Sequence, residues 1–219
     1  MENLISAFPF VAFLLYKEHL IFAIILIILS TGMALVKFRT DYNITLWTPF
    51  SRRPYEYTTG FRKSFYLFIA AYILTIIAIS VNNFNLGIFA MLFVFAITLS
   101  YYMKPENQFY VWIFNQSPRQ FLSGKIKTAL YFTTLLALPI ILTLSIFYIQ
   151  LVHIIVVFLF IGWAFLIAII VTKYAVYPRE MNIPQAILLT LCIWFPPLLL
   201  IIIPYLFKKS ENNLKRLLT

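Results

Sequence analysis

The amino-acid sequence predicts an all-α protein, a polytopic integral membrane helical bundle with about six apolar segments. Hydrophobic residues make up 63% of the 219 residues and charged residues only 11%, whereas soluble domains average roughly 45–50% apolar and about 25% charged residues. The apolar residues gather into runs, several of which approach the ~20 residues that a helix needs to cross a bilayer. No polar stretch is long enough to fold a separate soluble domain, so residues 1–219 are expected to form a single transmembrane domain.

The net charge of +10 points to membrane surfaces rather than to nucleic acid. The 17 Lys and Arg residues stand at the ends of apolar runs, where they contact anionic headgroups. We therefore expect the lipid bilayer as a partner and no nucleic acid. The single cysteine, Cys192, lies inside an apolar run and cannot form an intrachain disulfide.

The chain in order starts with residues 5–16, which are apolar but too short to cross and are interpreted as an amphipathic lead-in. The turn at Asn82-Asn83 is uncharged and short, as expected for the tip of a helical hairpin. Another turn is expected at 150–153, because the apolar residues around it are too many for one crossing. The expected spans are 20–36, 65–81, 86–102, 129–149, 154–172 and 187–207.

Basic residues alternate along the loops and set the orientation. They are frequent in 37–64, 104–127 and 173–184 and absent from the two turns. The positive-inside rule therefore places these three loops in the cytoplasm. Within 37–64, Pro49, Pro54 and Gly60 are expected to break any long helix.

The last apolar run contains Pro196-Pro197 and leads into a basic tail. A single crossing would put this tail outside, against the positive-inside rule. We favour a re-entrant hairpin that turns back at the two prolines. One kinked crossing is the alternative.

The loop 104–127 contains a helix start that the residues themselves indicate. Ser117 can accept a hydrogen bond from a free N–H of the first turn, and Pro118 has the φ of a first helical position. On a helical wheel, the residues after Pro118 divide into an apolar arc and a polar arc. This division predicts an interfacial helix that continues into a span. The apolar arc holds Phe121, Leu122, Ile126 and Ala129, and the polar arc holds Arg119, Gln120, Ser123 and Lys127.

The expected spans contain no ionisable residues that would indicate catalysis or ion coupling. No acid and no Lys or Arg lies near a span centre, which disfavours an ion-coupled transporter. The two histidines, His19 and His153, are far apart, and we expect no catalytic residue, metal or cofactor. The loop acids Asp41, Glu56, Glu106 and Glu180 stand singly over three loops.

The loop 104–127 resembles a loop of a known protein family. Two neighbouring segments carry the resemblance. They are Phe109-Tyr110-Val111-Trp112 and Asn115-Gln116-Ser117-Pro118-Arg119-Gln120-Phe121-Leu122-Ser123-Gly124-Lys125. Together they resemble the cytoplasmic loop of type-2 ABC transporter permeases. The tail 205–215 is similar to the end of some bacterial permeases of this type. The likeness covers roughly residues 65–216, although the 20–36 span is additional to the family scheme.

The resemblance implies a function and partners. The chain would be a permease subunit in a bacterial inner membrane, without enzymatic activity of its own. It would pair with an ABC ATPase subunit and with a second permease subunit or a second copy. The residues implied to contact the ATPase are Ser117, Pro118, Arg119, Phe121, Leu122 and Lys125.

Two other function classes remain open at this stage. A non-enzymatic membrane assembly or anchoring factor would show the same spans. A membrane-embedded lipid-modifying enzyme is a third interpretation, which the scattered acids disfavour because a metal site needs them together.

Overall fold

The structure is a computed structural model that describes residues 17, 24, 50, 55–112 and 116–218. The chain divides into two compact units, Met1–Asn43 and Ile44–Thr219, and every helix named below belongs to the second. In the first unit, Lys17 lies in a turn and Ile24 in a helix. The rest of the expected span 20–36, the lead-in 5–16 and most of the loop 37–64 lie outside the described residues. A single transmembrane domain over 1–219 stays a prediction.

Helices α3 (Tyr55–Ser80) and α4 (Phe84–Ser100) form the first hairpin. Asn83 caps α4 from an extended backbone, and its Oδ1 accepts a hydrogen bond from the Leu86 N–H at 3.1 Å. Asn82 has a φ of 52°, in the left-handed region that Asn tolerates better than most residues. The hairpin tip predicted at Asn82-Asn83 is confirmed.

The start of α3 corrects the sequence-based boundary. The helix begins at Tyr55, not near residue 65, and it runs through Gly60, which was expected to break it. The lack of a side chain at Gly60 has a packing reason: a Cβ there would lie 2.5 Å from Cδ1 of Tyr101. Close contact with this ring offsets the roughly 0.5–1 kcal/mol that a helical glycine costs relative to alanine. Glu56, expected in a loop, therefore lies in the first turn of a long helix.

Helices α6 (Pro118–Phe147) and α7 (Val152–Val176) form the second hairpin, joined by the 3-10 turn η1 (Ile149–Leu151). Ser117 is extended, its Oγ accepts from the Gln120 N–H at 3.4 Å, and Pro118 follows as the first helical residue. The predicted helix start and the predicted reversal near residue 150 are both confirmed. The interfacial helix and the span expected at 129–149 are one continuous helix. The short helix α5 (Gln108–Trp112) precedes it.

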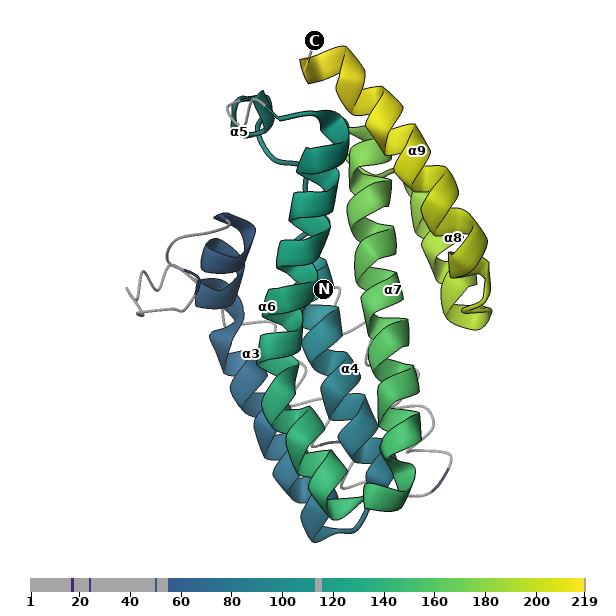
Figure 1. Cartoon of the computed structure of the whole chain (residues 1–219). Helices are drawn as coiled ribbons and strands as arrows, with labels where there is room; N and C mark the ends of the chain where they lie inside the picture. Colours follow the sequence, from purple (N-terminus) through teal and green to yellow (C-terminus); the bar gives the residue numbers. More distant parts are fainter. Residues whose placement is uncertain (1–16, 18–23, 25–49, 51–54, 113–115, 219) are drawn as a thin grey trace. The chain divides into compact units, whose positions relative to one another are not determined.

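The two hairpins lie side by side as a bundle of α3, α4, α6 and α7 (Figure 1). Side chains such as Met91, Phe95 and Ile140 form its buried core. Polar groups are bonded across or within the helices: Tyr72 Oη donates to the Leu136 carbonyl at 2.9 Å, and Thr75 Oγ1 donates to the preceding turn of its own helix. An all-α helical bundle is the observed fold.

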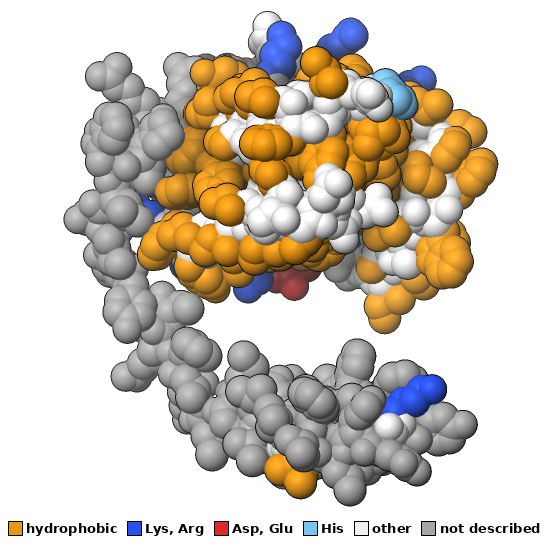
Figure 2. All heavy atoms as spheres, turned by 90° about the horizontal axis from the view of Figure 1, so that it is seen from below, with side chains coloured by type: hydrophobic (Ala, Val, Ile, Leu, Met, Phe, Trp, Pro, Cys, Tyr) orange, Lys and Arg blue, Asp and Glu red, His pale blue; other side chains and the backbone are white. Residues whose placement is uncertain are grey.

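Three of the described helical segments, Glu56–Ser80, Pro118–Phe147 and Ile149–Val176, are long and apolar enough to cross a membrane. α4 and α8 (Ile183–Trp194) are shorter apolar helices. Many large apolar side chains face outward, among them Ile76 and Ile146, which are 66% and 74% exposed. Figure 2 views the bundle from the end that carries the two turns, where hydrophobic side chains dominate the coloured surface. These features are compatible with an integral membrane protein.

The last apolar run reverses direction, as the favoured hairpin predicted. α8 ends at Trp194, Pro196 and Pro197 form a turn, and α9 (Leu198–Leu218) runs back along α7 (Figure 1). The 12 residues of α8 extend about 18 Å, too short to cross ~30 Å of hydrocarbon. Ser210 Oγ donates to the Val171 carbonyl at 2.5 Å, and Asn213 Nδ2 donates to the Tyr177 carbonyl at 2.6 Å. The basic tail therefore lies at the end of the bundle where α7 ends.

Candidate functional site: a buried charge network and the cavity beside it

Four charged side chains from separate segments meet at one end of the bundle. Glu56 comes from the first turn of α3, and Glu106 from the connection between α4 and α5. Lys125 lies early in α6, and Lys173 lies in the last turn of α7. The topology brings them together because α3 and α6 begin where α4 and α7 end. We call these four residues the charge network.

Lys125 is the bridge between the two acids. Its Nζ lies 2.5 Å from Oε1 of Glu56 and 3.1 Å from Oε2 of Glu106. Lys173 Nζ lies 2.9 Å from Oε1 of Glu106. None of the four side chains is more than 9% exposed. Removing one partner from such buried pairs leaves an uncompensated charge, so the network fixes the relative positions of α3, α6 and α7.

Aromatic side chains enclose Glu106 and Lys173. Tyr174 Oη donates to Oε1 of Glu106 at 2.6 Å, and Tyr177 Oη donates to its backbone carbonyl at 3.1 Å. Lys173 Nζ lies 5.6 Å from the ring centre of Tyr102 and 5.3 Å from that of Tyr174. These contacts hold the connection between α4 and α5 against the end of α7, and the rings add cation–π attraction to the buried ammonium.

The electrostatic environment favours the ionised form of Glu106. Burial alone would raise the pKa of this carboxyl, but its interactions with Glu56, the charges of Lys125 and Lys173 and the hydrogen bond from Tyr174 together hold the pKa well below its usual range. Glu106 is therefore a carboxylate at every physiological pH.

The charge network corrects the interpretation of the acids as isolated loop residues. Glu56 and Glu106 share one ammonium group, although 50 residues of sequence separate positions 56 and 106. One signal pointed to it: Lys125 lies on the same buried side of α6 as Phe121 and Leu122. A lysine among apolar neighbours requires a buried acid, but the sequence does not say which acid supplies it.

The six residues implied to contact an ATPase divide into two groups. Ser117 and Arg119 are exposed, and Pro118 between them is half-buried. Phe121, Leu122 and Lys125 are buried. The ring of Phe121 packs edge-on against Tyr174 at 5.3 Å between centroids. The first group can touch a partner directly, whereas the second group attaches the start of α6 to the rest of the bundle.

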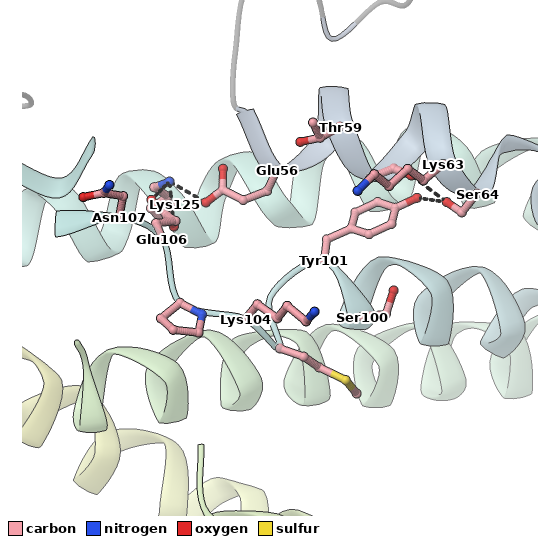
Figure 3. Close-up of a pocket in the computed structure, with 13 residues that line it drawn as sticks. Glu56, Thr59, Lys63, Ser64, Ser100, Tyr101, Lys104, Glu106, Asn107 and Lys125 are labelled. Carbon is pink, nitrogen blue, oxygen red and sulfur yellow. Dashed lines mark hydrogen bonds and ion pairs between the residues drawn. The ribbon is translucent and has the colours of Figure 1, made fainter. Parts of the chain in front are cut away.

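A cavity of about 700 Å³ lies beside the charge network (Figure 3). Glu56, Glu106 and Lys125 form one part of its wall. The rest of the wall comes from the first turns of α3, the end of α4 and the connection after it: Thr59, Gly60, Lys63, Ser64, Ser100, Tyr101, Met103, Lys104, Pro105 and Asn107. Within the part of the chain that the structure describes, no group of three or more His, Cys, Asp or Glu side chains could hold a metal ion.

Comparison with known proteins gives no family for this chain. No protein-family model, no curated protein and no solved structure matches it.

Proposed function

We propose that this chain is the membrane-spanning permease subunit of an ATP-driven transporter, and that the start of α6 receives the movement of a separate ATPase subunit. One observation carries the proposal. α6 is a single helix from its capped, exposed first turn at Ser117 to Phe147 at the other end of the bundle, about 45 Å away. Pro139 removes one backbone hydrogen bond inside α6, so a displacement at the first turn moves at least the part of the helix that precedes this residue.

The charge network passes such a movement to the neighbouring helices. Lys125 joins α6 to Glu56 of α3 and, through Glu106, to Lys173 of α7. Because these pairs are buried, breaking them is costly, and the three helices shift together rather than slide past one another. In the proposed transporter, this is how a push on one helix becomes a rearrangement of the bundle.

The surface offered to the ATPase is the outer side of the first turns of α6. Ser117, Arg119, Gln120 and Gly124 are exposed. Gly124 has no heavy atom within 4 Å of the position that a Cβ would take. An ATPase surface can therefore approach closely here, with Arg119 as the charged contact.

The location of buried charge supports an external source of energy. Among the described residues, the buried charged side chains are those of the charge network, at one end of the helices. Coupling ions usually bind at ionisable groups or broken helices near the membrane centre. The position of these groups in the described part of the chain is consistent with energy from ATP hydrolysis by a partner.

The proposed orientation puts the charge network and the basic tail in the cytoplasm of a bacterium, at its inner membrane. Lys208 and Lys209 of the tail come to the same end as Lys125 because α9 turns back along α7. Basic segments are retained on the cytoplasmic side. The translocation path would form between this subunit and a second permease subunit or a second copy.

Site-directed cross-linking in native membranes tests the proposal. In a chain with Cys192→Ala, Gly124→Cys is expected to cross-link to a protein that is also labelled by a photoreactive ATP analogue. Asn85→Cys, exposed at the opposite end of the bundle, provides the matched control and is expected to give no such product. If Gly124→Cys yields only partners that do not bind ATP, the assembly or anchoring interpretation replaces the permease.

A further inference from the structure

The cavity beside the charge network has a positive rim. Lys63 from α3 and Lys104 from the connection after α4 line it, and both side chains are exposed. Neither has an ion-pair partner among the described residues. Figure 3 shows both lysines near Tyr101, while Glu56, Glu106 and Lys125 group together elsewhere on the wall.

The network has no excess negative charge that could compensate the rim lysines. The two acids, Glu56 and Glu106, face two ammonium groups, Lys125 and Lys173, so the acids do not outnumber the cations. Both Glu106 oxygens already accept hydrogen bonds from Lys125, Lys173 or Tyr174. The field at the mouth of the cavity is therefore set by the two rim lysines, which favour an anion.

The polar groups of the wall leave the two rim lysines as the contacts for such a ligand. Asn107, whose Oδ1 accepts from the Phe109 N–H at 3.2 Å, lies beyond Glu106 and Lys125 as seen from Lys63 and Lys104 (Figure 3). Ser64 and Tyr101 are committed to each other at 2.5 Å, and Ser64 Oγ also donates to the Gly60 carbonyl. Two ammonium groups are suitable contacts for phosphate oxygens.

The wall also has an apolar surface, which favours an amphiphilic ligand over a small ion. Most of the surface area of the wall is apolar, and Met103, Pro105 and the Tyr101 ring contribute to it. The cavity lies where α3 begins and α4 ends, at the end of the apolar helices. Lipid headgroups lie at this level, and basic pockets between helices on the cytoplasmic side are where acidic headgroups bind.

We propose that this cavity binds the phosphate group of an acidic phospholipid, with Lys63 and Lys104 as its cationic contacts. The glycerol and the first acyl carbons would lie against Met103 and Pro105. The proposal is independent of the transport function, because it rests on the cavity, its uncompensated charge and its position along the helices.

A lipid titration of the detergent-purified full chain tests this site. Short-chain phosphatidylglycerol is expected to raise the melting temperature saturably, and phosphatidylcholine is expected to have little effect. Lys63→Gln with Lys104→Gln should weaken the apparent affinity for phosphatidylglycerol at least fivefold, since two charged contacts are lost. Lys63→Arg with Lys104→Arg should retain it.

The matched control removes the same charge from exposed lysines of the tail at the same end of the bundle, by Lys208→Gln with Lys209→Gln. Equal loss of affinity in both double variants would overturn the site, because any basic surface would then suffice. A parallel titration with sodium phosphate tests whether free phosphate, rather than a lipid headgroup, is the ligand. If sodium phosphate stabilises the protein as phosphatidylglycerol does, through the same two lysines, the ligand is free phosphate and not a lipid.

A second measurement needs no variant. A photoreactive phosphatidylglycerol analogue is expected to label the peptides that contain residues 59–63 and 100–107 of the wild-type chain. Labelling spread over the outward surfaces of α8 and α9 instead would overturn the proposal.

Discussion

The two ends of the helical bundle are built by different interactions. At one end, the reversals at Asn82-Asn83 and at Ile149–Leu151 are closed by backbone turns, an Asn cap and the Phe84–Tyr148 ring contact. At the other end, Glu56, Glu106, Lys125 and Lys173 close the bundle through buried ion pairs. The reversals at the first end are specified by neighbouring residues, and the Phe84–Tyr148 contact adds packing between the two hairpins. The second depends on partners that are distant in the chain.

This difference shows where the molecule can respond to another protein. A cap and a short turn stabilise a reversal but connect only neighbouring helices. The charge network connects α3, α6 and α7 at the point where the first turn of α6 is exposed. We therefore expect mutations at the charged end to have larger and wider effects than mutations at the turns.

The largest effect is expected for Glu106→Ala. Removing this carboxylate leaves Lys173 without its anionic partner and Tyr174 without its acceptor. Leaving a buried charge unpaired costs about 3–5 kcal/mol, and thermal unfolding in detergent measures the loss. The control is Glu211→Ala, which removes an ion pair to Lys215 at 3.9 Å on the surface of α9. A surface pair of this kind contributes about 0.5 kcal/mol or less, so similar losses in both variants would contradict the buried network.

The pH dependence of stability follows from the lowered pKa of Glu106. A carboxyl whose pKa is lower in the folded state contributes stability that is complete above its unfolded pKa, near the usual value of 4.5, and is lost as the pH falls toward the folded pKa. The melting-temperature difference between the wild type and Glu106→Gln should stay constant from pH 8 to pH 6. It should shrink below about pH 4.5. A difference that shrinks between pH 8 and pH 6 would show that another group governs the network.

Two glycines at the charged end are expected to respond oppositely to alanine. A Cβ at Gly60 would lie 2.5 Å from the Tyr101 ring, so Gly60→Ala should destabilise the protein by about 1–3 kcal/mol. Gly124 has open space around it, and Gly124→Ala should be neutral or stabilise by up to about 1 kcal/mol through helix propensity. If Gly60→Ala were as neutral as Gly124→Ala, the α3 contact with Tyr101 would not be tight.

The smallest effect is expected at the uncharged end. Asn83→Ala removes the side chain that caps α4 through the Leu86 N–H. Loss of an Asn cap costs about 1 kcal/mol. Thermal unfolding is again the measurement, with Asn85→Ala, an exposed residue of the first turn of α4, as the control. If Asn83→Ala destabilised as much as Glu106→Ala, the contrast between the two ends would be wrong.

Local signals in the sequence predicted most of the helical bundle. The cap at Ser117 and the hairpin tip at Asn82-Asn83 each depend on a few neighbouring residues. The reversal at Pro196-Pro197 was favoured because a basic tail follows it, and the structure has all three. The start of α3 was missed because Gly60 has no local reason to remain helical. Its reason is the ring of Tyr101, which reaches it from the end of α4.

The candidate site was harder to predict because its parts come together only in three dimensions. The one available signal, which was not used in predicting the site, is that Lys125 shares a helix face with Phe121 and Leu122 and so needs an acid nearby. Neither Glu56 nor Glu106 could be assigned to it, since both stand in polar stretches that read as loops. The cavity beside them combines α3 with the connection after α4, and no pattern in a single segment predicts that pairing.

The central claim is that the exposed start of α6 couples this chain to an ATPase. The most direct measurement is the ATP hydrolysis that co-purifies with the affinity-tagged full chain from native membranes. We predict vanadate-sensitive hydrolysis with the wild type, its loss with Arg119→Glu, and its retention with Lys208→Glu and Lys209→Glu, which change exposed charges in the tail. Equal hydrolysis with Arg119→Glu, or none with the wild type, would contradict the claim.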